Sequence, residues 1–327
     1  MNKNYLLNVL ILICLYPTYL NSSNLLTQSI PIKSGWNSVY LYVQPLEKQS
    51  DLVFQNKPFV KVLTYYPANS LVQFIQDPNE IEWNKPGWLR WINQDQPDAF
   101  LKNLYSIHAN QAYLILSTMD YTWELKGEPR YRNVAWTPDS FNLIGFNVAE
   151  NYSPSFSQFF SNSNAHKDLQ IFYLNNDQWT RIQNPELTTI QSGKAYWVYC
   201  NGGSNYNGPF EILLPDDFEE LSYYYPISDY TISIINNSNE SKLFTIRQVQ
   251  QQTVPLFIET YSTNYEKIRI PLNSYNPTSP IKPYEKQNIK IIVNRNDTKD
   301  KEMTGLLNIF DDSGNEFFIK VWVENLQ

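Results

Sequence analysis

The sequence predicts a mainly β protein: a tandem-repeat β domain with short helices, followed by an immunoglobulin-like antiparallel β-sandwich. Three observations support this fold class. A strand motif near residue 35 returns near residue 140, aromatic residues make up 15% of the chain, and short strand-like segments succeed one another after residue 214. Aromatic side chains favour strands because they pack well on a pleated, half-buried surface. The 327 residues have room for two or three domains, since one domain usually takes about 100–200 residues.

Residues 1–23 are predicted to form a secretory signal peptide. Lys3 precedes an apolar stretch from Tyr5 to Tyr16, and the small residues Ser22 and Ser23 follow. A basic start, a short apolar segment and a small-residue exit are typical of export signals, and a membrane span needs about 20 apolar residues. We therefore expect an exported protein that is extracellular, periplasmic or cell-surface, without membrane insertion beyond this segment. Its retention as an uncleaved anchor stays open.

The tandem-repeat domain is predicted over 28–213, with copy one at about 28–130. The motif Gly35-Trp36-Asn37 opens an apolar strand, which Pro45 ends because proline cannot donate to a sheet ladder. A short helix within 46–55 is expected to follow. The remaining strands of copy one are predicted at 59–66, 112–116 and 123–125.

Copy two, at about 131–213, repeats this order. Its strands are predicted at 141–148, 169–174, 195–199 and 210–212, with a helical piece around Phe156, Phe159 and Phe160. Aromatic residues at matching strand positions are expected in the core, where each buries about 150–250 Å². These residues are Trp36, Tyr113, Trp123, Tyr196 and Trp197. The duplication therefore predicts architecture more directly than activity.

Copy one contains an insertion that copy two lacks. Gly35 to Tyr113 spans 78 positions and Ser140 to Tyr196 spans 56, a difference of 22. The insertion and its border carry Trp83, Trp88 and Trp91 among amide and charged residues, which is the composition of a carbohydrate or protein contact surface. The alternative is a loop folded onto the core with its indoles buried. Trp91 favours the core, because Trp179 is taken as its counterpart in copy two.

The sandwich is predicted over 214–327. Its strands are expected at 230–235, 242–249, 256–260, 267–272, 288–294, 306–310 and 317–323. Seven short strands at regular spacing are typical of an immunoglobulin-like sandwich. The Asn- and Asp-rich segments 236–239 and 311–315 are predicted hairpin turns. Exposed edge strands of such a sandwich can pair with a partner chain.

Composition and motif spacing argue against several classes of chemistry. A net charge of −7 without a basic cluster predicts no nucleic-acid partner. His108 and His166 fall in different copies, so neither a metal nor a cofactor is expected, and Cys200 is interpreted as a small strand residue. The carboxylates at Asp216/Asp217, Glu219/Glu220, Glu124 and Glu211 are interpreted as solvated rather than as a glycosidase pair. The protein is not expected to be an enzyme.

The repeat motifs resemble those of uncharacterised bacterial exported and surface proteins. The resemblance lies in Gly35-Trp36-Asn37, its echo at 140–148 and the closing Gly193-Lys194-Ala195-Tyr196-Trp197, and it covers about 30–213. In that group, tandem Gly-Trp-Asn and Gly-x-Ala-Tyr-Trp β modules precede an immunoglobulin-like domain. This chain departs from the pattern, with Ser140-Phe141 for Gly-Trp and Asn110-Gln111 for Gly-Lys. The resemblance implies an exported, noncatalytic module and no particular site residues.

The predicted function is therefore that of a secreted or cell-surface noncatalytic structural and interaction module. Its expected partner is an extracellular protein or a polysaccharide. The alternative is a carbohydrate-binding protein that uses Trp83, Trp88 and Trp91 of the insertion. A hydrolase is the third and least favoured reading.

Overall fold

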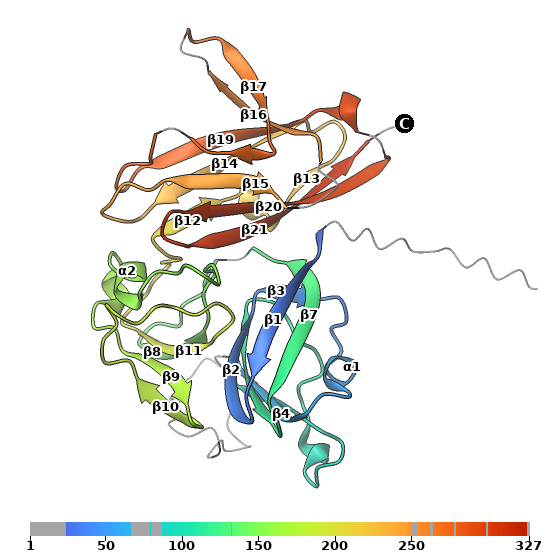
Figure 1. Cartoon of the computed structure of the whole chain (residues 1–327), viewed down its shortest axis with the longest axis vertical. Helices are drawn as coiled ribbons and strands as arrows, with labels where there is room; N and C mark the ends of the chain where they lie inside the picture. Colours follow the sequence, from blue (N-terminus) through green and yellow to red (C-terminus); the bar gives the residue numbers. More distant parts are fainter. Residues whose placement is uncertain are drawn as a thin grey trace, which may run out of the picture.

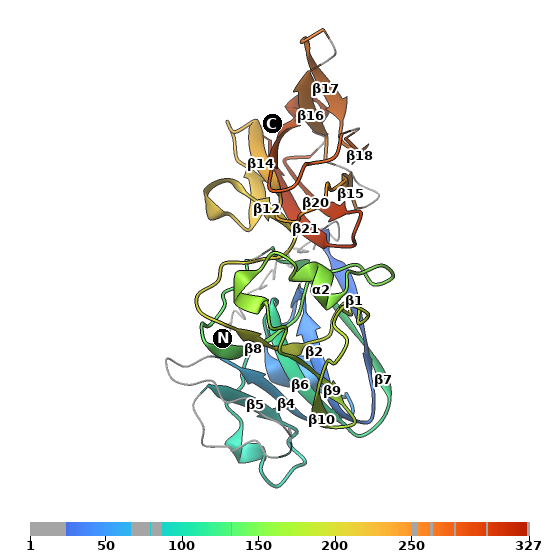
Figure 2. The same ribbon diagram turned by 90° about the vertical axis from the view of Figure 1, so that its left-hand side faces the viewer.

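The computed structural model describes residues 24–66, 79, 87–131, 133–249, 254–261, 264–277, 279–298 and 300–325. The predicted signal peptide at 1–23 and Trp83 lie outside these residues. The repeats form one end of the elongated molecule and the sandwich forms the other (Figures 1 and 2). The chain is mainly β, and its C-terminal part is an immunoglobulin-like sandwich, which confirms the predicted fold class.

Copy one forms two sheets. In chain order its elements are β1 (Leu26–Ile32), β2 (Gly35–Leu41), β3 (Val43–Pro45), α1 (Ser50–Phe54), β4 (Phe59–Tyr65), β5 (Trp88–Ile92), the 3-10 turn Ala99–Leu101, β6 (Gln111–Ser117) and β7 (Tyr121–Pro129). One sheet has the order β2-β6-β4-β5 and the other β1-β7-β3. The single strand predicted to begin at Gly35 and to end before Pro45 is thus divided between two sheets. Buried Gln28 bridges the break, because its Nε2 donates to the carbonyl of Tyr40 and its Oε1 accepts from the amide of Tyr42.

Copy two repeats the larger sheet of copy one. Its elements are β8 (Ser140–Ile144), α2 (Phe156–Phe159), the 3-10 turn Asn164–His166, β9 (Ile171–Asn175), β10 (Gln178–Arg181) and β11 (Tyr196–Cys200). The order β8-β11-β9-β10 matches the order β2-β6-β4-β5 of copy one: in both sheets the first, fourth, second and third strands along the chain lie side by side. The predicted duplication therefore extends to sheet topology.

An asparagine and a tyrosine of the repeated motif make equivalent hydrogen bonds in both copies. The Asn37 Nδ2 donates to the carbonyls of Lys33 and Gly35, and the Asn142 Nδ2 donates to those of Thr137 and Ser140. The hydroxyls of the two motif tyrosines each accept from an amide five positions earlier in the chain; the tyrosines are Tyr113 and Tyr196. The recurring residues thus hold local turns and strand ends.

The two repeat sheets pack against each other over a shared aromatic core. Its buried members are Trp36, Leu63, Tyr65, Trp88, Leu114, Trp179 and Trp197. The opposite face of each sheet packs within its own copy, around Trp123 in copy one and Phe156 in copy two. All five aromatic residues predicted to lie in the core are buried.

The register of the sheets corrects one predicted equivalence. Trp88 lies opposite Tyr65 on β4, and Trp179 lies opposite Leu174 at the matching place on β9. Trp179 is therefore the counterpart of Trp88, and not of Trp91 as the spacing suggested. Ile182, which continues the register opposite Ile171, takes the place of Trp91.

The sandwich consists of two five-stranded sheets. Its strands are β12 (Phe210–Leu213), β13 (Glu220–Tyr223), β14 (Asp229–Asn236), β15 (Phe244–Gln248), β16 (Leu256–Tyr261), β17 (Lys267–Pro271), β18 (Ser274–Tyr275), β19 (Lys286–Val293), β20 (Glu302–Asp311) and β21 (Glu316–Glu324), with 3-10 turns at Pro215–Asp217 and Arg295–Asp297. The sheet orders are β12-β14-β19-β16-β17 and β13-β21-β20-β15-β18. All neighbouring strands are antiparallel except β13 and β21, which run parallel.

The predicted closing strand of copy two and the predicted hairpin turn at 236–239 are wrong. Residues 210–212 do not close copy two, because β12 pairs with β14 and Phe210 and Ile212 lie in the sandwich core. In copy one the last strand, β7, pairs with β1, the strand before β2. In copy two the described residues just before β8 form no strand equivalent to β1, so a closing strand would have no partner there. The predicted turn at 236–239 joins strands of different sheets, whereas 311–315 forms the expected hairpin turn.

Candidate functional site

The insertion tryptophans that the structure describes are buried. Trp88 is 5% exposed and contacts Tyr65 and Trp197, while Trp91 is 4% exposed and packs on Phe54. The Trp91 Nε1 donates to Asp51 at 2.7 Å. Neither indole presents a face to a ligand, which corrects the expectation of an exposed aromatic surface at these two positions. For Trp83, which the structure does not describe, binding stays a prediction.

The sandwich contacts the repeats through the β20–β21 hairpin. The Ala149 amide donates to the Gly314 carbonyl at 2.9 Å, and the Glu316 amide donates to the Asn147 carbonyl at 3.1 Å. Tyr131 reaches from the end of copy one into the sandwich core, where its hydroxyl donates to the carbonyl of Ile212. Backbone bonds and a buried aromatic side chain thus fix how the two parts meet.

Replacing Gly314 with alanine is expected to loosen this junction. Gly314 has a φ of +87°, and a Cβ there would lie 1.9 Å from the Tyr152 carbonyl oxygen. We expect a lower melting temperature and a larger radius of gyration in X-ray scattering, because the hairpin cannot approach copy two. Gly202→Ala is the matched control, since Gly202 has a φ of +71° but nothing within 4 Å. Equal scattering profiles for the two variants would contradict the assignment.

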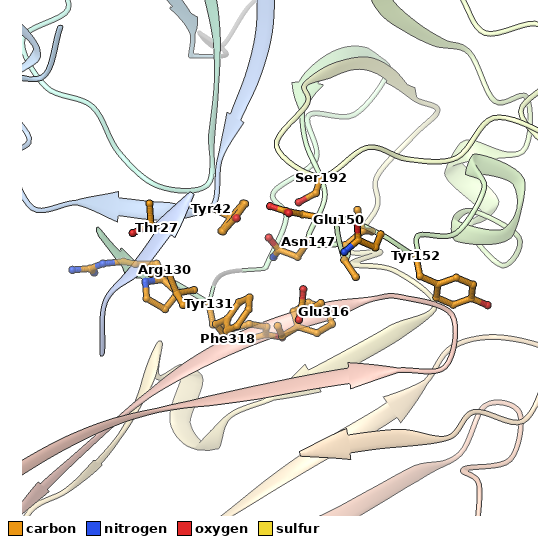
Figure 3. Close-up of a pocket in the computed structure, with 16 residues that line it drawn as sticks. Thr27, Tyr42, Arg130, Tyr131, Asn147, Glu150, Tyr152, Ser192, Glu316 and Phe318 are labelled. Atoms are coloured by element: carbon orange, nitrogen blue, oxygen red, sulfur yellow. The ribbon is translucent and has the colours of Figure 1, made fainter. Parts of the chain in front are cut away.

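A cavity of about 400 Å³ lies at this junction. Its walls come from β1, the segment after β2, the end of β7, the loop after β8 and the start of β21, so that both repeats and the sandwich contribute. Figure 3 shows Tyr42, Glu150, Asn147 and Glu316 extending toward one space from three parts of the chain. Concave sites with apolar walls and a few convergent polar groups are the usual places for small ligands. This cavity is the candidate functional site.

The two carboxylates of the cavity act on the phenol of Tyr42. Burial raises the pKa of the Tyr42 phenol, and the negative charges of Glu150 and Glu316 raise it further. The phenol therefore stays protonated and is available as a hydrogen-bond donor. The three residues are separated by 108 and 166 positions in the chain. No local motif marks them, so sequence reasoning missed this site.

Two reactive side chains, Cys200 and His166, lie in surroundings that disfavour their charged forms. Burial raises the pKa of the Cys200 thiol, which disfavours the nucleophilic thiolate. Burial lowers the pKa of His166 to about 4, and its Nδ1 contacts the Ser163 hydroxyl at 2.6 Å. Among the residues that the structure describes, no group of three or more His, Cys, Asp or Glu side chains could hold a metal ion.

Four of the carboxylates singled out in the sequence have polar partners. Glu219 pairs with Arg130 at 3.0 Å, and Glu220 pairs with Lys320 at 2.7 Å. Glu124 accepts from Ser29, and Glu211 accepts from Asn207 and Asn237. These contacts give the carboxylates structural partners at the junction and on strand surfaces.

No helix within the described ranges is long and apolar enough to cross a membrane. No family model matches the sequence, and no curated protein is similar to it.

The comparison with solved structures found a PapD-like domain, a periplasmic chaperone and an MSCRAMM protein among its matches, each with a TM-score below 0.5. A PapD-like domain of human CEP192 shares 8% identity over 36% of this chain and 86% of its own, with a TM-score of 0.23. The periplasmic chaperone SfaE shares 15% identity over 36% of this chain and 59% of its own, with a TM-score of 0.21. The Enterococcus faecalis MSCRAMM ACE, which binds its ligands by the collagen hug, shares 10% identity over 92% of this chain and 90% of its own, with a TM-score of 0.19. The fold described above follows from this chain's own strand order and register.

Proposed function

We propose that this chain is an exported, noncatalytic structural and interaction module, related to the bacterial surface proteins that its repeat motifs resemble. The recurring residues support the structural part, because they are engaged in turns and in the shared core. Export is supported by the features of residues 1–23. The observation that carries the interaction part is the open edge strand β17.

Among the described strands, β17 pairs only with β16, and all five of its residues are exposed. The β16–β17 hairpin projects from the end of the sandwich farthest from the repeats (Figures 1 and 2). The Leu272 amide donates to the Leu256 carbonyl just beyond β17. Since hydrogen-bonding direction alternates along an antiparallel strand, the backbone groups of Lys267 and Arg269 face outward. They are available to an added strand.

The side chains of β17 disfavour pairing with a second copy. Lys267 and Arg269 stand on one face beside Glu259, at 3.0 and 3.7 Å. Ile268 and Ile270 occupy the other face and are 38% and 37% exposed. Two β17 strands side by side would place like charges together, and lysine on an edge protects against such pairing. The edge therefore suits an extended segment of a different macromolecule.

A photo-crosslinking amino acid at position 269 of the full-length protein tests this function in the producing cells. We expect an adduct with an external macromolecule from position 269, removable by protease added to intact cells. The matched control is position 186, where Glu186 is exposed on copy two. Protein that protease cannot reach from outside, or identical adducts from both positions, would contradict the proposal.

A further inference from the structure

The junction cavity has a negative centre without a cation of its own. Glu150 makes no ion pair or side-chain hydrogen bond among the described residues. Glu316 accepts one hydrogen bond, from the Asn308 Nδ2 at 2.8 Å, and has no ion pair in the described part of the chain. The hydroxyl of Tyr42, which lines the same cavity, has no partner among the described residues either. Two carboxylates and a phenol are thus left for a ligand.

The lining is otherwise apolar or neutral. Leu26, Pro129, Val148 and Phe318 supply apolar wall, and Thr27, Asn147 and Ser192 supply neutral polar groups. Arg130 is the one cation among the described lining residues, and it pairs with Glu219 at 3.0 Å. Its guanidinium points away from Tyr42 and Glu150 (Figure 3). An anionic ligand would therefore meet two like charges at the centre and no free cation.

We propose that this cavity binds a primary ammonium group carried on a short methylene chain. The ammonium would lie between Glu150 and Glu316, where it has three donors and needs acceptors. The Tyr42 phenol oxygen would accept one of its hydrogen bonds, and the methylene stem would lie along Val148 and Phe318. Such a group occurs in free diamines and in the lysine side chain of a peptide, and the cavity chemistry is the same for both.

The position of the cavity makes binding depend on docking of the sandwich. Tyr42 belongs to copy one, Glu150 to copy two and Glu316 to the sandwich. A change that separates these parts should abolish binding although all three side chains remain. The site is distant from β17 in the fold, so its test is independent of the edge-strand function (Figure 1).

Isothermal titration with cadaverine at low salt tests the proposal directly. We expect saturable 1:1 binding to the full chain. Adding 0.5 M salt should weaken this binding, because salt screens the attraction between the ammonium group and the carboxylates. Glu150→Gln and Glu316→Gln should each weaken binding about tenfold, as expected for loss of a charge-assisted hydrogen bond. Glu186→Gln, an equal change at an exposed carboxylate outside the cavity, should leave binding unchanged. Gly314→Ala should abolish it.

A second arm separates the two sources of the ammonium group. The tripeptide acetyl-Gly-Lys-Gly-amide is compared with cadaverine and with the same peptide carrying norleucine in place of lysine. Stronger binding of the lysine peptide identifies a protein side chain as the ligand, and stronger binding of cadaverine identifies a free diamine. No saturable binding of either, equal binding of the norleucine peptide, or equal effects of Glu150→Gln and Glu186→Gln would overturn the proposal.

Discussion

Replacing Gly145 with alanine is expected to destabilise the protein by about 1–3 kcal/mol, the range for overpacking a tight core. A Cβ at this position would lie 2.2 Å from the Tyr40 Cγ and 2.7 Å from the Lys194 carbonyl oxygen. Tyr40 and Gly145 occupy the same position of the repeat, one in each copy. The large residue of copy one therefore packs on the missing side chain of copy two. Chemical denaturation of the variant and the wild type measures the loss.

Gly203→Ala is the matched control for this prediction. Gly203 has nothing within 4 Å of the added methyl group, so its replacement should change stability by less than about 0.5 kcal/mol. Adding Tyr40→Ala to Gly145→Ala should not recover the loss, because alanine keeps the Tyr40 Cβ, which would lie 2.3 Å from the added methyl group. If Gly145→Ala proves as stable as Gly203→Ala, the copies do not pack through this contact.

Replacing Trp197 with alanine is expected to cost about 3–5 kcal/mol, as for other large buried aromatic residues. Trp197 is fully buried in the core that the two repeats share and contacts Tyr65, Trp88 and Trp179. The cavity left behind would open between the two sheets rather than within one. We expect a lower denaturation midpoint and a loss of cooperativity between the copies, measured by tryptophan fluorescence and far-ultraviolet circular dichroism.

Two further variants calibrate the Trp197 result. Leu114 takes the matching position in copy one, so Trp197→Leu should cost less than Trp197→Ala. Phe100→Ala removes an aromatic residue that is 82% exposed and should have little effect. Similar losses for Trp197→Ala and Phe100→Ala would show that the shared core does not hold the repeats together.

Most strands were predictable because their signals are local. Alternating apolar residues mark β2, and Pro45 marks the end of β3. All seven strands predicted for the sandwich are present, with ends within one or two residues of the prediction or somewhat longer. The turn at 311–315 was also predictable, since Asp311 accepts from the amides of Ser313 and Asn315. These features need only neighbours in the chain.

The errors arose where pairing decides between equivalent local signals. Trp91 and Trp88 are three positions apart, and only the register of β5 on β4 shows which one corresponds to Trp179. Residues 210–212 read like the closing triplet of copy one, but a strand needs a neighbour for its backbone groups. In this fold β14 provides that neighbour and draws β12 into the sandwich.

The candidate site was beyond prediction for a related reason. Tyr42, Glu150 and Glu316 have ordinary surroundings in the chain and become a group only when the β20–β21 hairpin meets copy two. That meeting depends on the close approach of Gly314 to Tyr152, which is a matter of shape rather than of sequence pattern.

The sequence by itself determined the mainly β character, the duplication and the existence of a C-terminal sandwich, because periodicity and composition act over a few neighbouring residues. The tertiary structure alone decided which strands pair, that the insertion residues Trp88 and Trp91 are buried, and that three distant polar side chains share one cavity. These outcomes follow from backbone hydrogen bonds and packing between segments that are not neighbours in the chain, which no local pattern encodes.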